Sequence, residues 1–446
     1  MTKRISVWLT VVLIILTSVI TFQLTVIFGS AFVRDNSLGS LSPNDRFGNT
    51  TTSDTVPTDT NVPEETTAPD DTPAEPKPVT AKDITAAVSA KISTLATYYE
   101  RYYVGELDID ALVEGAAEGF VAYVGDKYGQ YHTAEEYKEL TSSYSGEFAG
   151  IGVSVVYNSD YGAIEILNVM PDSPALEGGL LPDDLIISVN GESVMAIGYN
   201  EAVNRIRGEI GTSVLLTIAR GENYEEHFDV TLTRRKVEEQ SVTYEEIPIK
   251  GLKQPVAYIR ITDFNAKTPE QFSSALGEGK TNNVHGFIFD LRNNGGGTLD
   301  SVVTMLDMVL PEGPIVRIQY KNGEEKVYES RASCLDEPIV VLVNGNTASA
   351  AELFVSALRD YGKATPIIGE TTYGKGTVQT IVPLIDGSAL RLSTSMYAPP
   401  YSDNFEGIGV VPDMEVPLAD EYKNVNLFKL DLENDAQLQA AVRVFQ

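Results

Sequence analysis

Two short segments carry residues that could perform acyl transfer. Ser349 follows an apolar run, residues 338–343, and precedes a helix-like stretch, residues 353–358. A strand, a tight turn and a helix start can lift a serine hydroxyl out of the fold and point backbone N–H groups at the space above it. Lys375 stands between two glycines, and a buried lysine can lose its proton and act as a base. Together the two residues predict a Ser/Lys hydrolase.

The pKa of Lys375 sets a condition on this chemistry. A free lysine has a pKa near ~10.4, and a base useful at neutral pH needs a pKa about three units lower. The difference corresponds to roughly 4 kcal/mol of disfavoured charge, which burial can supply. We therefore expect that exposing Lys375 to water would silence it.

Other interpretations of these residues are weaker. A lone serine before a helix is usually an N-cap. Residues 369–375 resemble a phosphate-binding loop, but no Ser or Thr follows Lys375 directly, and an apolar strand follows where that loop needs a helix. An ion pair of Asp290 with Arg292 is expected to be structural. We predict no metal site and no cofactor, because the three histidines lack metal-ligand spacing and make a Ser-His-Asp triad hard to build: His132, His227 and His285.

Composition limits the possible partners. The chain has 446 residues, enough for two or three domains, and its apolar fraction of 43% is ordinary for a folded protein. The formal net charge of −30 argues against a nucleic-acid partner, because phosphates would be repelled. The single cysteine, Cys334, allows no intramolecular disulfide.

The N-terminus predicts a membrane anchor. Residues 5–33 carry no charge and follow Lys3 and Arg4. Residues 7–29 are long enough, at ~1.5 Å per residue, to cross a ~30 Å hydrocarbon layer. We expect a transmembrane helix there, with residues 1–6 in the cytoplasm and the rest of the chain outside. The alternative is a cleaved signal peptide, although its apolar region is normally only ~7–15 residues.

Three further regions precede the catalytic segments. Residues 30–80 are rich in Thr, Pro and acidic residues and predict a disordered tether. Residues 81–145 show helical periodicity, and Thr133 with Glu136 predicts a capping box. Residues 146–236 change to short strands and turns.

The strand-rich region resembles a PDZ domain in the circularly permuted arrangement of bacterial proteases. The resemblance implies a peptide site at Gly150, Ile151, Gly152 and Val153. Successive N–H groups of such a glycine turn can hold a terminal carboxylate, and the strand after it can pair with the peptide backbone. A β-rich module without a ligand is the alternative.

Strands and helices alternate from residue 237 to residue 446, which predicts an α/β core with crossover helices. Five motifs of the chain look like those of the carboxyl-terminal processing proteases: residues 343–352, 369–379, 290–297, 125–128 and 407–413. The resemblance implies a ClpP/crotonase-like α/β protease core with an inserted PDZ domain and an N-terminal helical region.

The same resemblance implies roles for individual residues. Ser349 is the nucleophile, Lys375 the general base and Gln379 the residue that positions the lysine. The amide of Ala350 supplies one oxyanion donor, and a glycine amide, favoured as Gly296, supplies the other. The family usually has proline where Gly295 stands, so the identity of the oxyanion glycine stays open. Lys375 and Gln379 would share one face of a strand of period two, together with Thr377.

The resemblance also implies regulation and partners. Arg207 is the PDZ-side residue expected to report peptide binding to Gln379, unless it is only a surface charge. The chain is expected to be a membrane-anchored, extracytoplasmic serine endopeptidase for proteins with apolar C-terminal tails, and to form a homodimer. Two alternatives remain open, a non-catalytic membrane-tethered PDZ adaptor and a ligand-carrying module on the same core. Cleavage of a peptide with an apolar C-terminus, lost in Ser349→Ala, distinguishes the enzyme from both.

Overall fold

A computed structural model describes residues 79–331, 334–419, 422, 427 and 430–446. The predicted segments 1–6 and 7–29, and the tether apart from its last two residues, lie outside the described residues. None of the helices described in these ranges is both long and apolar enough to cross a bilayer. The transmembrane helix in the predicted fold class is therefore corrected, because a span needs ~20 predominantly apolar residues, and the longest described helix carries charges along its length.

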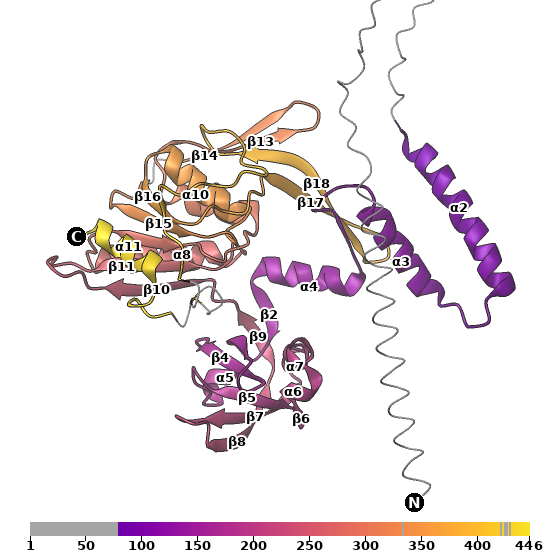
Figure 1. Ribbon diagram of the computed structural model, residues 1–446, viewed down its shortest axis with the longest axis horizontal. Coiled ribbons are helices and arrows are strands. Elements are labelled where there is room, and N and C mark those ends of the chain that lie inside the picture. Colours follow the sequence, from indigo (N-terminus) through magenta and orange to yellow (C-terminus); the bar gives the residue numbers. More distant parts are fainter. Residues whose placement is uncertain (1–78, 332–333, 420–421, 423–426, 428–429) are drawn as a thin grey trace, which may run out of the picture. The chain divides into compact units, whose positions relative to one another are not determined.

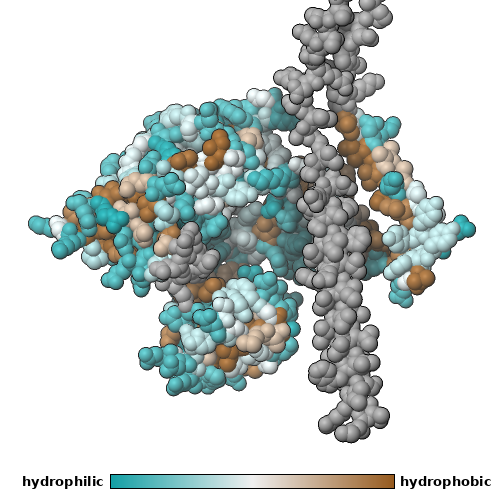
Figure 2. Space-filling view, viewed as in Figure 1, coloured by the Kyte–Doolittle hydropathy of each residue, from teal (hydrophilic) through white to brown (hydrophobic). Residues whose placement is uncertain are grey.

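That longest helix, α2 (Ala81–Tyr102), is described by itself, because the chain divides into two compact units, residues 1–101 and 102–446. Its apolar residues recur every three or four positions, and none of its residues is buried. Ile84, Val88, Ile92 and Leu95 expose between 38% and 47% of their surfaces. Figure 2 shows apolar side chains following one another along this helix.

The second unit begins with two helices and a short strand, α3 (Ile109–Ala122), β1 (Gln130–His132) and α4 (Ala134–Ser145). Helix α4 begins with the predicted capping box: Thr133 Oγ1 accepts from the Glu136 amide at 3.3 Å, and Glu136 Oε2 accepts from the Thr133 amide at 2.9 Å. Strand β1 pairs antiparallel with a strand more than 250 residues later, β18 (Ala389–Ala398).

The PDZ region is a small sheet with strand order β3-β4-β5-β7-β8 and short helices. Strand β3 lies at one edge of this sheet, and the two-stranded ribbon β2–β9 joins the domain to the rest of the unit (Figure 1). The elements are β2 (Glu147–Gly150), β3 (Val153–Asn158), β4 (Ala163–Val169), α5 (Pro174–Glu177), β5 (Leu185–Val189), β6 (Glu192–Ser193), α6 (Val194–Ile197), α7 (Tyr199–Ile206), β7 (Ser213–Arg220), β8 (Glu226–Thr233) and β9 (Arg235–Glu238).

The remaining residues form an α/β core around a six-stranded sheet with the order β10-β11-β12-β15-β16-β19. Strands β11, β12, β15 and β16 run parallel, as crossover helices require. The elements are β10 (Val242–Ile247), β11 (Val256–Ile261), α8 (Thr268–Thr281), β12 (Phe287–Asp290), α9 (Leu299–Asp307), β15 (Ile339–Val343), α10 (Ala350–Asp360), β16 (Ala364–Gly369), β19 (Met414–Glu415) and α11 (Ala436–Val444).

Both faces of the central strands are covered, which explains their continuous apolar sequences. Every residue of β12 and β15 is buried. One face packs against α8, α9 and α10 through side chains such as Phe289, Val341 and Phe354. The other face packs against α11 through Ile288, Leu342 and Leu438. Figure 1 shows α11 lying across the sheet near the C-terminus.

A second sheet extends from the core and carries the lysine segment. Strand β18 pairs with β1, with β13 (Gly313–Tyr320) and with β17 (Thr377–Pro383), while β14 (Glu325–Ser330) pairs with β13. The hairpin of β17 and β18 is the long ribbon in Figure 1. Lys375 lies two residues before the start of β17, where the chain returns from the central sheet to this hairpin.

Candidate active site

Ser349 occupies a strained turn between β15 and α10. Its φ and ψ are 60° and −121°, a conformation that residues with a Cβ atom rarely adopt. Such strain persists only where the surroundings enforce it, and it is concentrated at functional sites. Two hydrogen bonds hold this turn against the loop after β12: Thr347 Oγ1 donates to the Leu291 carbonyl at 2.8 Å, and the Ala348 amide donates to the Asn294 carbonyl at 2.9 Å.

Glu352 connects the serine turn to the lysine segment. This carboxylate is completely buried in the first turn of α10. Its Oε2 accepts from the amides of Ser349 and Lys375, both at 2.8 Å. Its Oε1 accepts from the Gly374 amide at 2.6 Å and from Thr372 Oγ1 at 2.5 Å. One side chain therefore fixes the backbone of both predicted catalytic residues.

The Lys375 side chain is half-buried near the Glu352 carboxylate. Burial lowers its pKa, and the nearby positive charges of Arg391 and Lys127 lower it further, while Glu406 and Glu352 oppose the shift. The ammonium Nζ lies 5.0 Å from the ring centroid of Tyr128. Among the described residues, no hydrogen bond joins Nζ to the Ser349 hydroxyl. The backbone of Lys375 is thus held next to that of Ser349 by Glu352, whereas the Lys375 side chain lies against Tyr128.

Gln379 faces its own strand in this conformation. Its Nε2 donates to Thr377 Oγ1 at 2.9 Å and to the Thr377 carbonyl at 3.2 Å. Strand β17 begins only at Thr377, and its pairing with β18 shifts register between Val378 and Gln379. The extra residue, Thr394, lies on β18, so side chains still alternate along β17. Because β17 begins after Lys375, the shared face of Lys375 and Gln379 stays a prediction.

The loop after β12 packs against the serine. A Cβ atom on Gly296 would lie 2.8 Å from Ser349 Cβ and 2.9 Å from the Ala350 amide nitrogen, and its φ is 106°. The Gly296 amide, predicted as the other oxyanion donor, donates to Asn294 Oδ1 at 2.8 Å in this conformation. Ala350 is the first residue of α10, and amides of a first helical turn have no partner inside the helix. The Ala350 amide, predicted as one oxyanion donor, is therefore not used inside the helix.

Tyr397 is a further group at the site. Its buried hydroxyl donates to the Lys375 carbonyl at 2.7 Å. Burial raises its pKa strongly, and a hydrogen bond with the Ser349 hydroxyl partly opposes the rise. The phenol is therefore protonated and positioned beside both predicted catalytic residues.

The sequence patterns assigned no role to Glu352, Tyr397 or Tyr128. Glu352 had a signal, because Ser349 followed three residues later by Glu is the spacing of a capping box. Tyr397 had none, because β18 approaches the site only through its pairing with β17. Tyr128 lies in the motif at residues 125–128, but that motif does not indicate a contact with Lys375.

Arg207 lies at the junction of the PDZ domain and the β2–β9 ribbon. Its guanidinium carbon lies 5.9 Å from the ring centroid of Phe148, a residue of β2. Burial raises the pKa of Glu239, and the charge of Arg207 partly offsets that rise. In the described part of the chain Arg207 makes no hydrogen bond to Gln379.

The predicted peptide site has an edge strand and an apolar lining. Gly150 ends β2, Val153 begins β3, and Gly152 has a φ of 80° that glycine adopts without strain. Ile151 is buried, and its carbonyl accepts from the Ala175 amide at 2.8 Å. Four apolar side chains of β3 and α7 are partly buried and pack against the core of the PDZ domain: Val153, Val155, Tyr199 and Val203.

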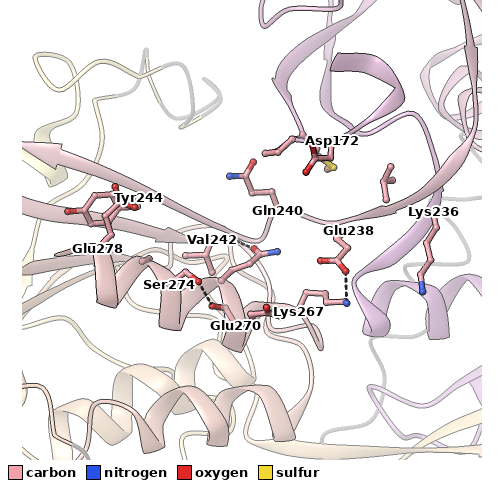
Figure 3. Close-up of a pocket in the computed structure, with 15 residues that line it drawn as sticks. Asp172, Lys236, Glu238, Gln240, Val242, Tyr244, Lys267, Glu270, Ser274 and Glu278 are labelled. Carbon is pink, nitrogen blue, oxygen red and sulfur yellow. Dashed lines mark hydrogen bonds and ion pairs between the residues drawn. The ribbon is translucent and has the colours of Figure 1, made fainter. Parts of the chain in front are cut away.

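A cavity of about 690 Å³ lies away from Ser349, where the β9 strand meets α8 and β10 (Figure 3). Lys267 Nζ projects toward Glu238 at 2.6 Å in this view, and it also lies 2.9 Å from Glu147 of β2. These ion pairs attach the PDZ ribbon to the start of α8. Within the described ranges, no three His, Cys, Asp or Glu side chains converge as metal ligands do.

Asp290 and Arg292 form a buried ion pair beside the loop after β12. Arg292 Nη2 lies 2.6 Å from Asp290 Oδ2 and 2.8 Å from Asp435 Oδ2, and Asp435 caps α11. Burial would raise the pKa of Asp290, but Arg292 lowers it to about 2. The pair anchors the C-terminal helix to the sheet, in agreement with the structural role predicted for it.

Comparison with known proteins identifies the class of this fold and site. Residues 255–416 match the model of peptidase family S41, and residues 165–220 match that of the PDZ domain. A protein described as an S41 protease from Bacteroides fragilis has a similar solved fold, with a TM-score of 0.51 and 18% identity over 77% of this chain and 92% of that chain.

Two curated relatives carry the comparison further. The carboxy-terminal-processing protease of Bartonella bacilliformis is 34% identical over 73% of this chain and 74% of its own length. The carboxy-terminal processing protease CtpA of Bacillus subtilis is 34% identical over 75% of this chain and 71% of its own length. The chain belongs to peptidase family S41, among the carboxy-terminal processing proteases, and it is a serine-type peptidase with a PDZ domain. The predicted family and protease fold are thereby confirmed, and the adaptor and carrier alternatives are set aside.

Proposed function

We propose that this peptidase cleaves proteins near apolar C-terminal tails, with Ser349 as nucleophile and Lys375 as general base. The observation that carries the proposal is the Glu352 carboxylate, which accepts from the amides of both residues at 2.8 Å. Two motifs that are separate in the sequence thus share one buried anchor. The lowered pKa of Lys375, caused mainly by burial, favours the neutral amine that a base requires.

The chemical steps follow from these two groups. Ser349 Oγ attacks the carbonyl carbon of the scissile bond and gives its proton to the neutral Lys375 Nζ. The tetrahedral intermediate collapses, the C–N bond breaks, and the Lys375 ammonium returns the proton to the leaving amine. Water then attacks the acyl ester, with Lys375 accepting a proton and passing it to Ser349 Oγ, so one water is consumed for each bond cleaved.

Backbone and side-chain donors complete the site. The Ala350 amide, in the first turn of α10, would donate to the developing oxyanion. The Gly296 amide supplies the second donor when it releases Asn294 Oδ1 and donates to the substrate oxygen instead. Catalysis also requires the Lys375 side chain to turn from Tyr128 toward Ser349, where Gln379 would hold it.

The PDZ domain would select the substrate. The edge of β3 offers backbone groups to an extended peptide, and its apolar lining with α7 suits an apolar terminal side chain. The turn at Gly150, Ile151, Gly152 and Val153 would receive the terminal carboxylate. Arg207 would transmit occupancy of this groove through Phe148 and the ribbon rather than by direct contact with Gln379.

Two further aspects of the function concern the whole chain. We propose that the catalytic part acts outside the cytoplasm, since residues 5–33 lack charge and follow Lys3 and Arg4, as in export signals; protease added to intact cells should then degrade it. We also propose a homodimer, because α2 exposes an apolar face along its length; sedimentation of the chain should give twice the monomer mass.

A cleavage assay with the full-length chain tests the central proposal. A peptide with an apolar C-terminus should be cut, and the same peptide amidated at that end should be cut more slowly. Ser349→Ala and Lys375→Ala should both bind the peptide and leave it whole. Cleavage at an undiminished rate by either variant would overturn the assignment of that residue.

A further inference from the structure

The segment that precedes β1 reaches the lysine from outside the protease core. Asp126 attaches this segment to β18: its carboxylate accepts from the Ser393 amide at 2.7 Å and from Ser393 Oγ at 2.8 Å. The same carboxylate accepts from the Tyr128 amide at 3.0 Å. The backbone of Tyr128 is therefore fixed relative to the hairpin that Lys375 enters.

The ring of Tyr128 contacts two ammonium groups. Lys375 Nζ lies 5.0 Å from its centroid, and Lys127 Nζ lies 4.8 Å from it. Cations at this distance from an aromatic ring are attracted by its quadrupole. The phenol oxygen accepts from Lys127 Nζ at 3.0 Å and donates to Glu406 Oε1 at 3.1 Å.

The tyrosine is held at both ends, so the ring cannot follow the lysine. Glu406 is itself fixed, because its Oε2 accepts from the Gly376 amide at 2.6 Å, one residue after Lys375. The Lys375 ammonium, in contrast, makes no hydrogen bond or ion pair among the described residues and contacts the ring. The movable partner of this contact is the lysine.

We propose that Tyr128 is a positioning residue that holds the charged Lys375 ammonium away from Ser349 in the resting enzyme. The inference rests on the proposed function, in which Lys375 must be neutral and must reach the serine hydroxyl. A ring that stabilises the ammonium opposes both requirements. Substrate engagement would have to draw the lysine off the ring before the serine is activated.

Other charged groups also face Lys375 and set the background for this contact. Arg391 of β18 and Lys127 disfavour the ammonium, whereas Glu406 and Glu352 of α10 favour it. These groups would remain in a variant that lacks the ring. Removing the ring should therefore lower the pH at which Lys375 loses its proton, without abolishing its titration.

The test is the rate at which a fluorophosphonate probe labels Ser349 in the full-length chain without peptide. Labelling forms an Oγ–P bond, breaks the P–F bond and transfers the serine proton to Lys375, so its rate reports the neutral, turned lysine. Tyr128→Leu should label about threefold faster at pH values below the midpoint, because one exposed cation–π contact is lost. Its midpoint should fall by about half a unit, so that the rates converge at high pH.

Three matched variants accompany this measurement. Tyr128→Met also removes the ring and should show the same shift, which guards against a folding defect in one variant. Tyr128→Phe keeps the ring and should give a midpoint closer to that of the natural chain. Tyr320→Leu changes a tyrosine that is 41% exposed on β13 and should label like the natural chain.

The outcomes separate this inference from the proposed function. If Ser349→Ala or Lys375→Ala labels normally, the proposed chemistry fails. If those two variants are silent but the folded ring-less variants keep the natural rate and midpoint, the role of Tyr128 is overturned and the chemistry stands. A uniform loss of labelling at every pH in the ring-less variants would also overturn it, because a purely structural tyrosine would act in that way.

Discussion

At the scale of single residues, the site depends on one carboxylate that does no chemistry itself. Each oxygen of Glu352 accepts two hydrogen bonds, from Ser349 and Lys375 on one side and from Thr372 and Gly374 on the other. All four donors are held by a group with no solvent exposure. Hydrogen bonds to buried charged groups are worth about 1.5–3 kcal/mol each, so this joint is strong.

Replacing Glu352 with Gln tests whether these four hydrogen bonds hold the serine and lysine segments together. A glutamine offers one acceptor oxygen and presents an NH₂ group to two donors, so the serine and lysine turns should separate. We expect kcat to fall by about 100-fold, equivalent to ~3 kcal/mol, while the affinity of the PDZ groove for peptide is retained. Steady-state cleavage and peptide-binding measurements check this. Glu139→Gln on the exposed face of α4 is the matched control, and an E352Q enzyme with full kcat would contradict the argument.

At the scale of secondary-structure elements, local sequence explains the central sheet but not its neighbours. The runs at 287–289 and 339–343 are wholly apolar and buried, so their pattern alone predicts core strands. Strand β1 has three residues and pairs with β18, more than 250 residues later in the chain. No local sequence pattern predicts such a strand. The bulge at Thr394 of β18, opposite Val378 and Gln379, is equally hard to predict, because register shifts depend on the partner strand.

The same distinction between local patterns and tertiary contacts explains which features of the site the sequence predicts. Ser349, Lys375 and Ala350 come from motifs whose spacing along the chain carries the information. The orientation of the Gly296 amide and of the Lys375 ammonium depends on Asn294 and Tyr128, which are chosen by tertiary contacts. The candidate residues were therefore predictable, and the conformation in which they rest was not.

The glycine loop beside the serine gives a prediction at this scale. A Cβ atom at Gly296 would meet the Ala348 carbonyl oxygen at 2.8 Å, whereas one at Gly295 would meet nothing within 4 Å. Gly296→Ala should displace the Ser349 turn and lower kcat/KM by at least about tenfold, as small misplacements of reacting groups do. Gly295→Ala should keep most activity. Steady-state kinetics of the two variants check this. Equal activities would show that the loop accommodates a Cβ atom at Gly296 without displacing Ser349.

At the scale of the whole molecule, the PDZ domain reaches the catalytic core through the β2–β9 ribbon. Lys267 Nζ attaches that ribbon to α8 through Glu238 and Glu147, and Arg207 stacks on Phe148 of β2. A peptide that changes the position of α7 would act on Arg207 directly, because this residue caps the helix. Communication with the active site would then pass through the ribbon.

Arg207→Ala tests this route. We expect a several-fold smaller acceleration of Ser349 labelling by bound peptide, with little change in labelling without peptide, because Arg207 lies outside the catalytic contacts. Arg205→Ala is the control, since Arg205 pairs with Glu192 and Glu201 inside the PDZ domain. Equal acceleration in the natural chain and in R207A would exclude Arg207 from the coupling.

The C-terminal helix α11 is joined to the core through Arg292, which pairs with Asp290 and Asp435. The pKa of Asp290 determines how this connection depends on pH. The folded pKa of Asp290 is about 2, below its ordinary value of 3.8, so its ionised form stabilises the fold. This contribution, about 2 kcal/mol from the shift, is complete above pH ~4 and is lost as the pH falls toward 2. Asp290→Asn should lower the calorimetric Tm at pH 5 and flatten its decline between pH 4 and 2, because Arg292 loses its buried partner at every pH. Identical acid profiles for D290N and the natural chain would mean that other carboxylates, and not this ion pair, hold α11 against the sheet.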